Sequence, residues 1–121
     1  MRLLGSVPVL CCSRLEQSLN FYQQALQFVI LNKREGEHGL EWLHLQSGDT
    51  QLMLEQNPAS QTTHPTTSRL YLYTDDVMTM HHYLQAKGYE PGKVITTKFM
   101  QEFDLFDPDG QRLTIGQRLS E

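Results

Sequence analysis

The sequence predicts an α+β fold in which two βαβββ repeats form a cupped mixed sheet. Residues 42–56 match residues 103–117, about 61 positions further on, and both segments read as a strand, a Gly/Asp turn and a second strand. Each copy follows a short apolar strand and an amphipathic helical pattern. Residues 58–67, between the copies, are rich in Pro, Ser and Thr, which is typical of a linker.

The chain has 121 residues, which is enough to bury a hydrophobic core without disulfides or metals. We therefore expect a single domain over residues 1–121. Repeat 1 occupies about 1–57, the linker about 58–67, and repeat 2 about 68–121.

The first repeat begins with a predicted strand at 7–12, followed by Ser13 as a candidate helix N-cap. Apolar residues spaced by three and four then predict a helix that runs from Leu15 to Leu26. Further strands are predicted at 28–31, 40–46 and 51–56; the charged segment 32–38 ends the first of these, and a hairpin turn at 47–49 joins the other two.

The second repeat follows the same plan. A strand at 69–74 leads to Asp75 or Asp76 as N-cap of a helix that Gly88 ends. Strands are then predicted at 94–98, 102–106 and 111–118, with the turn Asp107-Pro108-Asp109-Gly110, a structural feature, between the last two.

Charge and cysteine content narrow the classes of function. The net charge is −4 and the basic residues are scattered, which argues against nucleic acid and membrane surfaces as partners. No apolar run approaches the roughly 20 residues of a membrane span. The two cysteines, Cys11 and Cys12, are adjacent on a predicted strand and point to opposite faces, so we expect no disulfide and a cytoplasmic protein. The short apolar N-terminus fits a first strand better than a signal peptide.

The motifs resemble those of a known superfamily. Three segments, Ser18 to Phe28, Leu52 to Glu55 and Phe106 to Leu113, are similar in order and spacing to the vicinal oxygen chelate superfamily, which includes glyoxalase I, extradiol dioxygenases and bleomycin-resistance proteins. The resemblance covers nearly the whole chain and implies the glyoxalase/bleomycin-resistance/dioxygenase fold. Where the family usually has glycine after the first helix, this chain has Gln27, so we expect a different helix exit.

Metal enzymes of that family hold a divalent ion with His or Glu at four strand positions. Projecting their pattern onto this chain gives Val7, Met53, Arg69 and Thr114. Valine has no donor atom, methionine and threonine have weak neutral ones, and arginine is a permanent cation. The residues at these four positions therefore predict no metal site and no cofactor here, and they favour the metal-free, bleomycin-resistance-like branch.

Alternation along the strands sorts side chains into two faces. The leucine-rich set is expected beneath the helices. The opposite set is predicted to line a ligand-binding concavity because aromatic rings and polar ends occur together in it. Its candidate ligand-binding residues are Cys11, Trp42, His44, Met53, Arg69, Tyr71, Tyr73, Phe103, Arg112 and Thr114, with Leu105 beside them.

Each assignment has a structural alternative. Trp42 and Phe103 are also explained by packing in a dimer interface, and Arg69 by a solvated or ion-paired strand residue. Cys11 is interpreted as an unreactive buried thiol, and no catalytic residue is assigned. One of His81 and His82 is expected to pack and the other to be solvated.

Three functions are compatible with the sequence. The favoured one is a metal-free homodimer that sequesters an antibiotic or metabolite, its small-molecule ligand, in a cleft at the dimer interface. The alternatives are a metal-dependent lyase, transferase or dioxygenase of the same superfamily, and an interaction module without a ligand.

Overall fold

The computed structural model describes residues 1–57 and 68–119, so the predicted linker lies outside the described residues. The chain divides into two compact units, one on each side of that segment. Each unit contains one helix and one four-stranded sheet in the order βαβββ. The predicted α+β class and its two repeats are therefore confirmed. No helix among the described residues is long and apolar enough to span a membrane.

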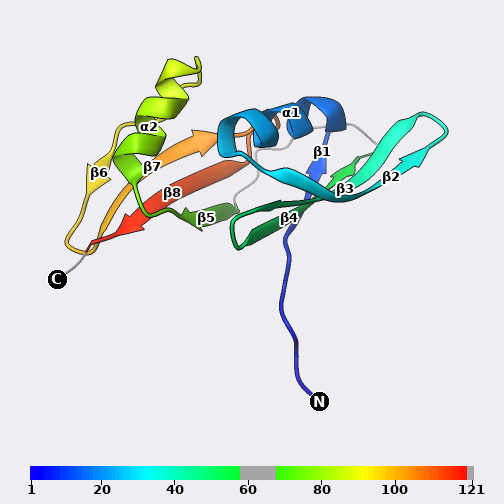
Figure 1. The fold of residues 1–121 in the computed structure, drawn as a ribbon, viewed down its shortest axis with the longest axis horizontal. Coiled ribbons are helices and arrows are strands. Elements are labelled where there is room, and N and C mark those ends of the chain that lie inside the picture. The colour runs from blue at the N-terminus through cyan, green and yellow to red at the C-terminus, as the bar shows by residue number, and fades with distance from the viewer. Residues whose placement is uncertain (58–67, 120–121) are drawn as a thin grey trace. The chain divides into compact units, whose positions relative to one another are not determined.

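The first unit contains β1 (Val9–Cys12), α1 (Leu15–Leu26), β2 (Val29–Gly36), β3 (Gly39–Ser47) and β4 (Thr50–Gln56). The strand order across its sheet is β1-β4-β3-β2 (Figure 1). The β1–β4 pair is parallel, and the two other pairs are antiparallel.

The second unit repeats this arrangement with β5 (Arg69–Tyr73), α2 (Val77–Ala86), β6 (Ile95–Thr96), β7 (Met100–Phe106) and β8 (Arg112–Arg118). Its strand order is β5-β8-β7-β6, with β5 parallel to β8. In both units, the strand before the helix thus pairs with the last strand of the repeat.

Each helix packs on one face of its own sheet, where the apolar core lies. In the first unit, the side chains of Leu43 and Leu54 are fully buried beneath α1, together with Tyr22 from the helix. In the second unit, Ile115 is buried beneath α2 in the same way. The leucine-rich set was predicted on this face. Its members on β3, β4 and β8 are buried, and Leu70 and Leu72 on β5 are partly buried.

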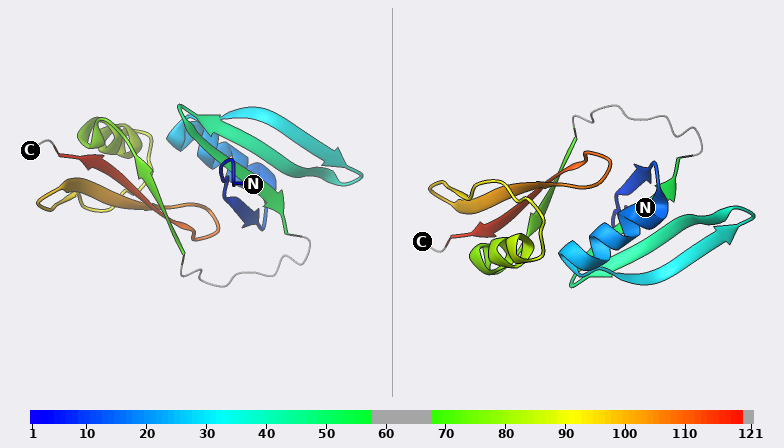
Figure 2. Two further views of the ribbon diagram at one scale, coloured as in Figure 1. Left: turned by 90° about the horizontal axis from the view of Figure 1, so that it is seen from below. Right: turned by 90° about the horizontal axis from the view of Figure 1, so that it is seen from above.

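Some predicted boundaries are wrong. The first strand begins at Val9 rather than at residue 7, and the chain before Pro8 extends away from β1 (Figure 1). The charged segment 32–38 does not end the second strand, because β2 continues to Gly36 in a hairpin with β3 that extends past α1 (Figure 2). Both faces of β2 are exposed, so its charged side chains remain hydrated and carry no burial cost.

The start of each helix is capped from the last strand of its repeat. The Gln56 side chain on β4 accepts a hydrogen bond from the backbone N–H of Leu15 at 2.9 Å, and Gln117 on β8 accepts one from Val77 at 2.8 Å. Ser13 was predicted to cap α1, but the N-cap is Arg14 and makes no side-chain capping bond. Asp76 caps α2, as one of the two predicted choices, by accepting from Thr79.

The end of α1 keeps the backbone shape that a glycine would favour. Gln27 has φ 59° and ψ 34°, which is the left-handed region, and the N–H of Phe28 bonds back to the carbonyl of Tyr22. The expectation that Gln27 would change the helix exit is therefore wrong. This hydrogen bond, a second one from the N–H of Gln27 to the carbonyl of Gln23, and the buried ring of Phe28 hold the conformation despite its cost for a non-glycine residue.

Candidate functional site

The face of each sheet opposite its helix carries the predicted ligand-binding residues, with one correction. Phe103 pairs with Ile115 across the β7–β8 ladder, and Leu105 pairs with Leu113. Directly paired residues point to the same face, so Phe103 and Leu105 lie in the core with those partners. Phe103 is 2% exposed, and its ring packs edge-on against His81 of α2 at 5.0 Å. The prediction that these two residues face the concavity is wrong.

The error has a simple cause in the hairpin loops. The β3–β4 turn contains Gly48 and Asp49 between the last paired residues, whereas the β7–β8 turn runs from Asp107 to Gln111. The difference is an odd number of residues, and an odd shift turns every side chain of a strand to the other face. A spacing of 61 residues therefore relates β4 to β8, but 60 relates β3 to β7, so that Asp104 is the counterpart of His44.

The helix-free face of the first unit brings together four of the predicted residues. Met53 on β4 lies between His44 on β3 and Val9 on β1. Two residues further along β4, Glu55 lies between Trp42 on β3 and Cys11 on β1. The rings of Trp42 and His44 are 6.1 Å apart. The His44 imidazole Nε2 also bonds to the Gln51 side chain at 2.8 Å, so the ring orientation is fixed.

Cys11 is exposed, and Cys12 is the buried cysteine, so the prediction of a buried Cys11 is wrong. The Cys11 thiol donates to Oε1 of Glu55 at 3.6 Å. Local desolvation, and then the hydrogen bond and negative charge of Glu55, raise the pKa of the Cys11 thiol. Because the thiolate is the nucleophilic form, Cys11 is poorly suited to covalent catalysis.

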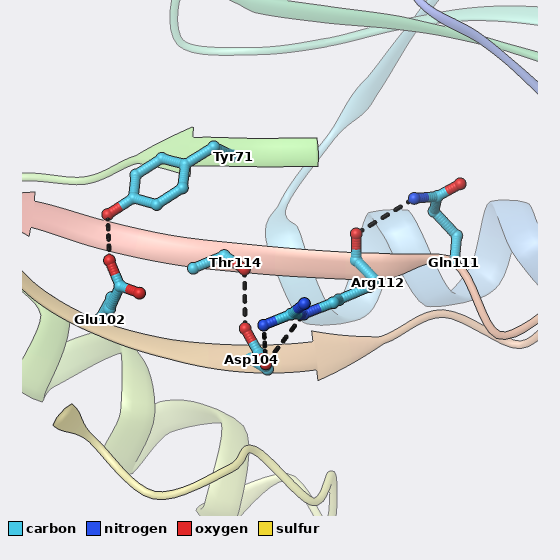
Figure 3. Close-up of polar contacts among 6 residues, drawn as sticks. All are labelled: Tyr71, Glu102, Asp104, Gln111, Arg112 and Thr114. Carbon is cyan, nitrogen blue, oxygen red and sulfur yellow. Dashed lines mark hydrogen bonds and ion pairs between the residues drawn. The ribbon is translucent and has the colours of Figure 1, made fainter. Parts of the chain in front are cut away.

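The helix-free face of the second unit holds a charged network (Figure 3). Asp104 accepts from the Thr114 hydroxyl at 2.7 Å and forms an ion pair with the Arg112 guanidinium at 3.0 Å. Both Arg112 and Thr114 were predicted site residues, and Thr114 is fully buried beneath the network. The charge of Arg112 is therefore already balanced within the face.

Tyr71 crosses its sheet to reach a second carboxylate. Its hydroxyl donates to Oε1 of Glu102 at 2.7 Å, from β5 over β8 to β7 (Figure 3). The residue beneath the ring is Gly116, where a Cβ atom would overlap the phenol. Burial, followed by the hydrogen bond to Glu102 and the charge of that carboxylate, raises the pKa of Tyr71 to about 12. The phenol thus remains a protonated hydrogen-bond donor at neutral pH.

A row of rings and guanidinium groups runs beside this network. The Arg69 guanidinium lies 5.8 Å from the Tyr71 ring, the Tyr71 and Tyr73 rings are 5.2 Å apart, and the Arg118 guanidinium lies 5.4 Å from Tyr73. We call these four residues the Arg–Tyr row. Three of them were predicted, and Arg118 was not, although its alternation with Arg112 and Thr114 on β8 was visible in the sequence.

Sequence reasoning also missed Glu102 and Asp104. Both lie on β7, where the assumed register put them on the helix side. The signal that would have found them is the length of the second hairpin loop, since Pro108 and Gly110 mark a longer turn than Gly48 alone.

The four positions projected for a metal ion do not suit one. Val7 precedes the first strand and offers no donor, Met53 and Thr114 are neutral, and Arg69 is a cation. The Thr114 hydroxyl is already committed to Asp104. Among the described residues, no three His, Cys, Asp or Glu side chains gather into a group that could hold a metal ion.

The sequence matches the family model described as Glyoxalase/Bleomycin resistance protein/Dioxygenase superfamily over residues 6–115. The match spans most of the chain, so the protein belongs to this superfamily, and the resemblance inferred from its motifs is confirmed. No curated protein shows significant similarity to the chain.

Solved structures of the same fold include two antibiotic-binding proteins. TnmS3, an antibiotic-binding protein from Streptomyces sp. CB03234, has a TM-score of 0.76 and 27% identity, covering 98% of this chain and 100% of its own. A bleomycin-binding protein complexed with bleomycin has a TM-score of 0.69 and 22% identity, covering 95% and 98%. Lactoylglutathione lyase from Agrobacterium tumefaciens has a TM-score of 0.73 and 16% identity, covering 93% and 92%. The last two are below 25% identity and share the fold alone.

Proposed function

We propose that this protein binds an antibiotic or a metabolite and sequesters it without chemical change. The observation that carries the proposal is the residue set at the four projected metal positions, of which Arg69 would repel a divalent ion. The fold is retained, yet the side chains that would make it a metalloenzyme are replaced. The similarity to TnmS3, an antibiotic-binding protein, supports the same function.

The helix-free faces have the composition that such a role needs. Trp42, Tyr71 and Tyr73 offer rings for stacking, while Arg69 and His44 offer polar contacts that orient a ligand. We place the ligand on these faces, in a cleft at the interface of a cytoplasmic homodimer. Sedimentation of the purified protein tests the dimer, because a monomer would contradict that part of the proposal.

A thermal-shift screen tests the function. It compares divalent metals (Mg²⁺, Mn²⁺, Ni²⁺, Zn²⁺) with a panel of cationic aromatic antibiotics and small acidic metabolites. A ligand at 100 times its Kd stabilises a protein by roughly 2.7 kcal/mol, so we expect organic compounds to raise the melting temperature and metals to leave it unchanged. Trp42→Ala or Arg69→Ala should reduce the organic shift.

Two results would contradict the proposal. One is a stoichiometric Ni, Zn, Mn or Fe ion retained through purification, which would favour a metal-dependent enzyme. The other is an organic shift that survives both substitutions, since the ligand would then bind elsewhere. Arg14→Gln provides a matched control, because Arg14 is exposed at the start of α1, on the helix side of the first unit's sheet.

A further inference from the structure

The arginines on the helix-free face of the second unit differ in how their charge is balanced. Arg112 is paired with Asp104 at 3.0 Å. Arg69 and Arg118 have no carboxylate within ion-pair distance among the residues that the structure describes, and each lies against a tyrosine ring instead. Two guanidinium groups of this face are thus available for an anion.

The nearby carboxylates are engaged by other groups. Glu102 accepts from Tyr71, and Asp104 accepts from Thr114 while it pairs with Arg112. Neither is directed to Arg69 or Arg118. An acidic ligand would therefore meet positive charge at both ends of the Arg–Tyr row without displacing an internal ion pair.

Of the two tyrosines between these arginines, Tyr71 is held in place and Tyr73 is exposed. Tyr71 is fixed by Glu102 and by the absence of a side chain at Gly116. Tyr73 is 64% exposed, which is a large fraction for an aromatic ring on a strand. Because Tyr71 needs no rearrangement, little conformational entropy is lost when a flat molecule stacks here.

We infer that the ligand is a planar aromatic molecule with an anionic group, stacked on the exposed ring of Tyr73, which is tilted by 54° from the Tyr71 ring beside it, and held at its charged end by Arg69 or Arg118. This inference rests on the proposed function and specifies the ligand class for one of its faces. The same row disfavours cationic ligands, because the guanidinium groups of Arg69 and Arg118 outnumber Glu102, the one carboxylate of this face that is not paired with an arginine among the residues that the structure describes.

Three naphthalene probes that differ only in charge test the inference. They are naphthalene-2-carboxylate, naphthalene-2-carboxamide and the ammonium 2-(aminomethyl)naphthalene, titrated into ¹⁵N-labelled full-length protein and followed by NMR. We expect the carboxylate to bind about tenfold more tightly than the carboxamide, the gain typical of a charge-assisted hydrogen bond. The affected amides should lie in β5 and β8.

Substitutions separate the charge from the rings. Glutamine in place of whichever arginine holds the carboxylate, Arg69→Gln or Arg118→Gln, should weaken carboxylate binding about tenfold and leave carboxamide binding unchanged. Tyr73→Leu should weaken binding of both probes. Arg14→Gln removes the same charge from the other unit and should change neither. Binding of the carboxylate should also fall as the salt concentration rises.

The outcomes distinguish this inference from the proposed function. Equal affinity for the three probes, or carboxylate binding that survives both arginine substitutions, overturns the inference. If cationic antibiotics shift the melting temperature while the carboxylate does not bind, the ligand class is wrong but sequestration stands. If no organic compound binds in either experiment, the proposed function itself fails.

Discussion

Single residues determine how the second unit's helix-free face is organised. Gly116 leaves room for the Tyr71 ring over β8, and the phenol donates a hydrogen bond to Glu102, so the two side chains together bridge β5, β8 and β7. Asp104 likewise orients Thr114 and Arg112 by accepting a hydrogen bond from each. The polar groups of this face are largely satisfied from within, which leaves the outer Arg–Tyr row as its distinctive feature.

The raised pKa of Tyr71 leads to a prediction for alkaline titration. At pH 11, tyrosines with an ordinary pKa near 10 are about nine-tenths ionised, whereas Tyr71, with a pKa of about 12, is mostly protonated. Absorbance of tyrosinate at alkaline pH should therefore show a step above pH 11 to which Tyr71 contributes. Glu102→Gln should move that step to lower pH.

The raised pKa of Tyr71 also determines how the stability of the fold changes with pH. The pKa is higher in the folded state, so the contribution of the bond to folding is complete below pH 10 and is lost as the pH rises through about 12. Tyr71→Phe should reduce the late step by the absorbance of one tyrosine. A late step of unchanged size in Tyr71→Phe would show that Tyr71 does not carry the raised pKa.

At the scale of elements, a glutamine on the last strand of each repeat forms a hydrogen bond with the first turn of the helix. Gln56 also donates to the Ser13 carbonyl at 2.7 Å, so a single side chain bridges the loop before α1. Gln117 occupies the matching place for α2. Both helices are short, and short helices depend on caps and packing rather than on propensity.

Removing either cap should lower stability. We expect Gln56→Met or Gln117→Met to cost about 1 kcal/mol in the free energy of unfolding, because the N–H of Leu15 or Val77 loses its partner. Urea denaturation followed by circular dichroism measures the change. Gln17→Met on the exposed side of α1 is the matched control, and an equal loss there would rule out the capping explanation.

At the scale of the molecule, the two repeats are similar but not superimposable residue for residue. The longer β7–β8 loop places Phe103 in the core and Asp104 on the open face, while the corresponding strand of the first repeat exposes Trp42 and His44 there. The two open faces therefore have different chemistry, one with an indole and an imidazole and the other with arginines, tyrosines and carboxylates.

The sequence repeat aligns Trp42 with Phe103, but because they lie on opposite faces of their sheets we expect their substitution to affect stability and ligand binding differently. Phe103→Ala should cost about 3–5 kcal/mol of stability, as for buried aromatic residues generally. Trp42→Ala, at a partly buried position, should cost clearly less and act mainly on ligand binding. Denaturation in urea and ligand titration of both variants check this. A small stability loss in Phe103→Ala would restore it to the ligand-facing set.

Much of the fold could be predicted because it depends on local patterns. Helical spacing placed α1 and α2, alternation placed the leucines of β3, β4 and β8 in the core, and motif order indicated the superfamily. The candidate site was predicted less completely. Cys11, Trp42, His44 and Met53 share one face, as do Arg69, Tyr71 and Tyr73, but Phe103 does not belong with them.

The sequence by itself determined the order of the elements and the composition of the core, since periodicity and turn residues act over a few neighbouring positions. Only the tertiary structure decided which face of β7 meets the helix, because strand facing depends on hairpin register and reverses with a shift of one residue. It also decided the long-range partners, such as Gln117 with Val77 and Tyr71 with Glu102, which pairing across the sheet brings together.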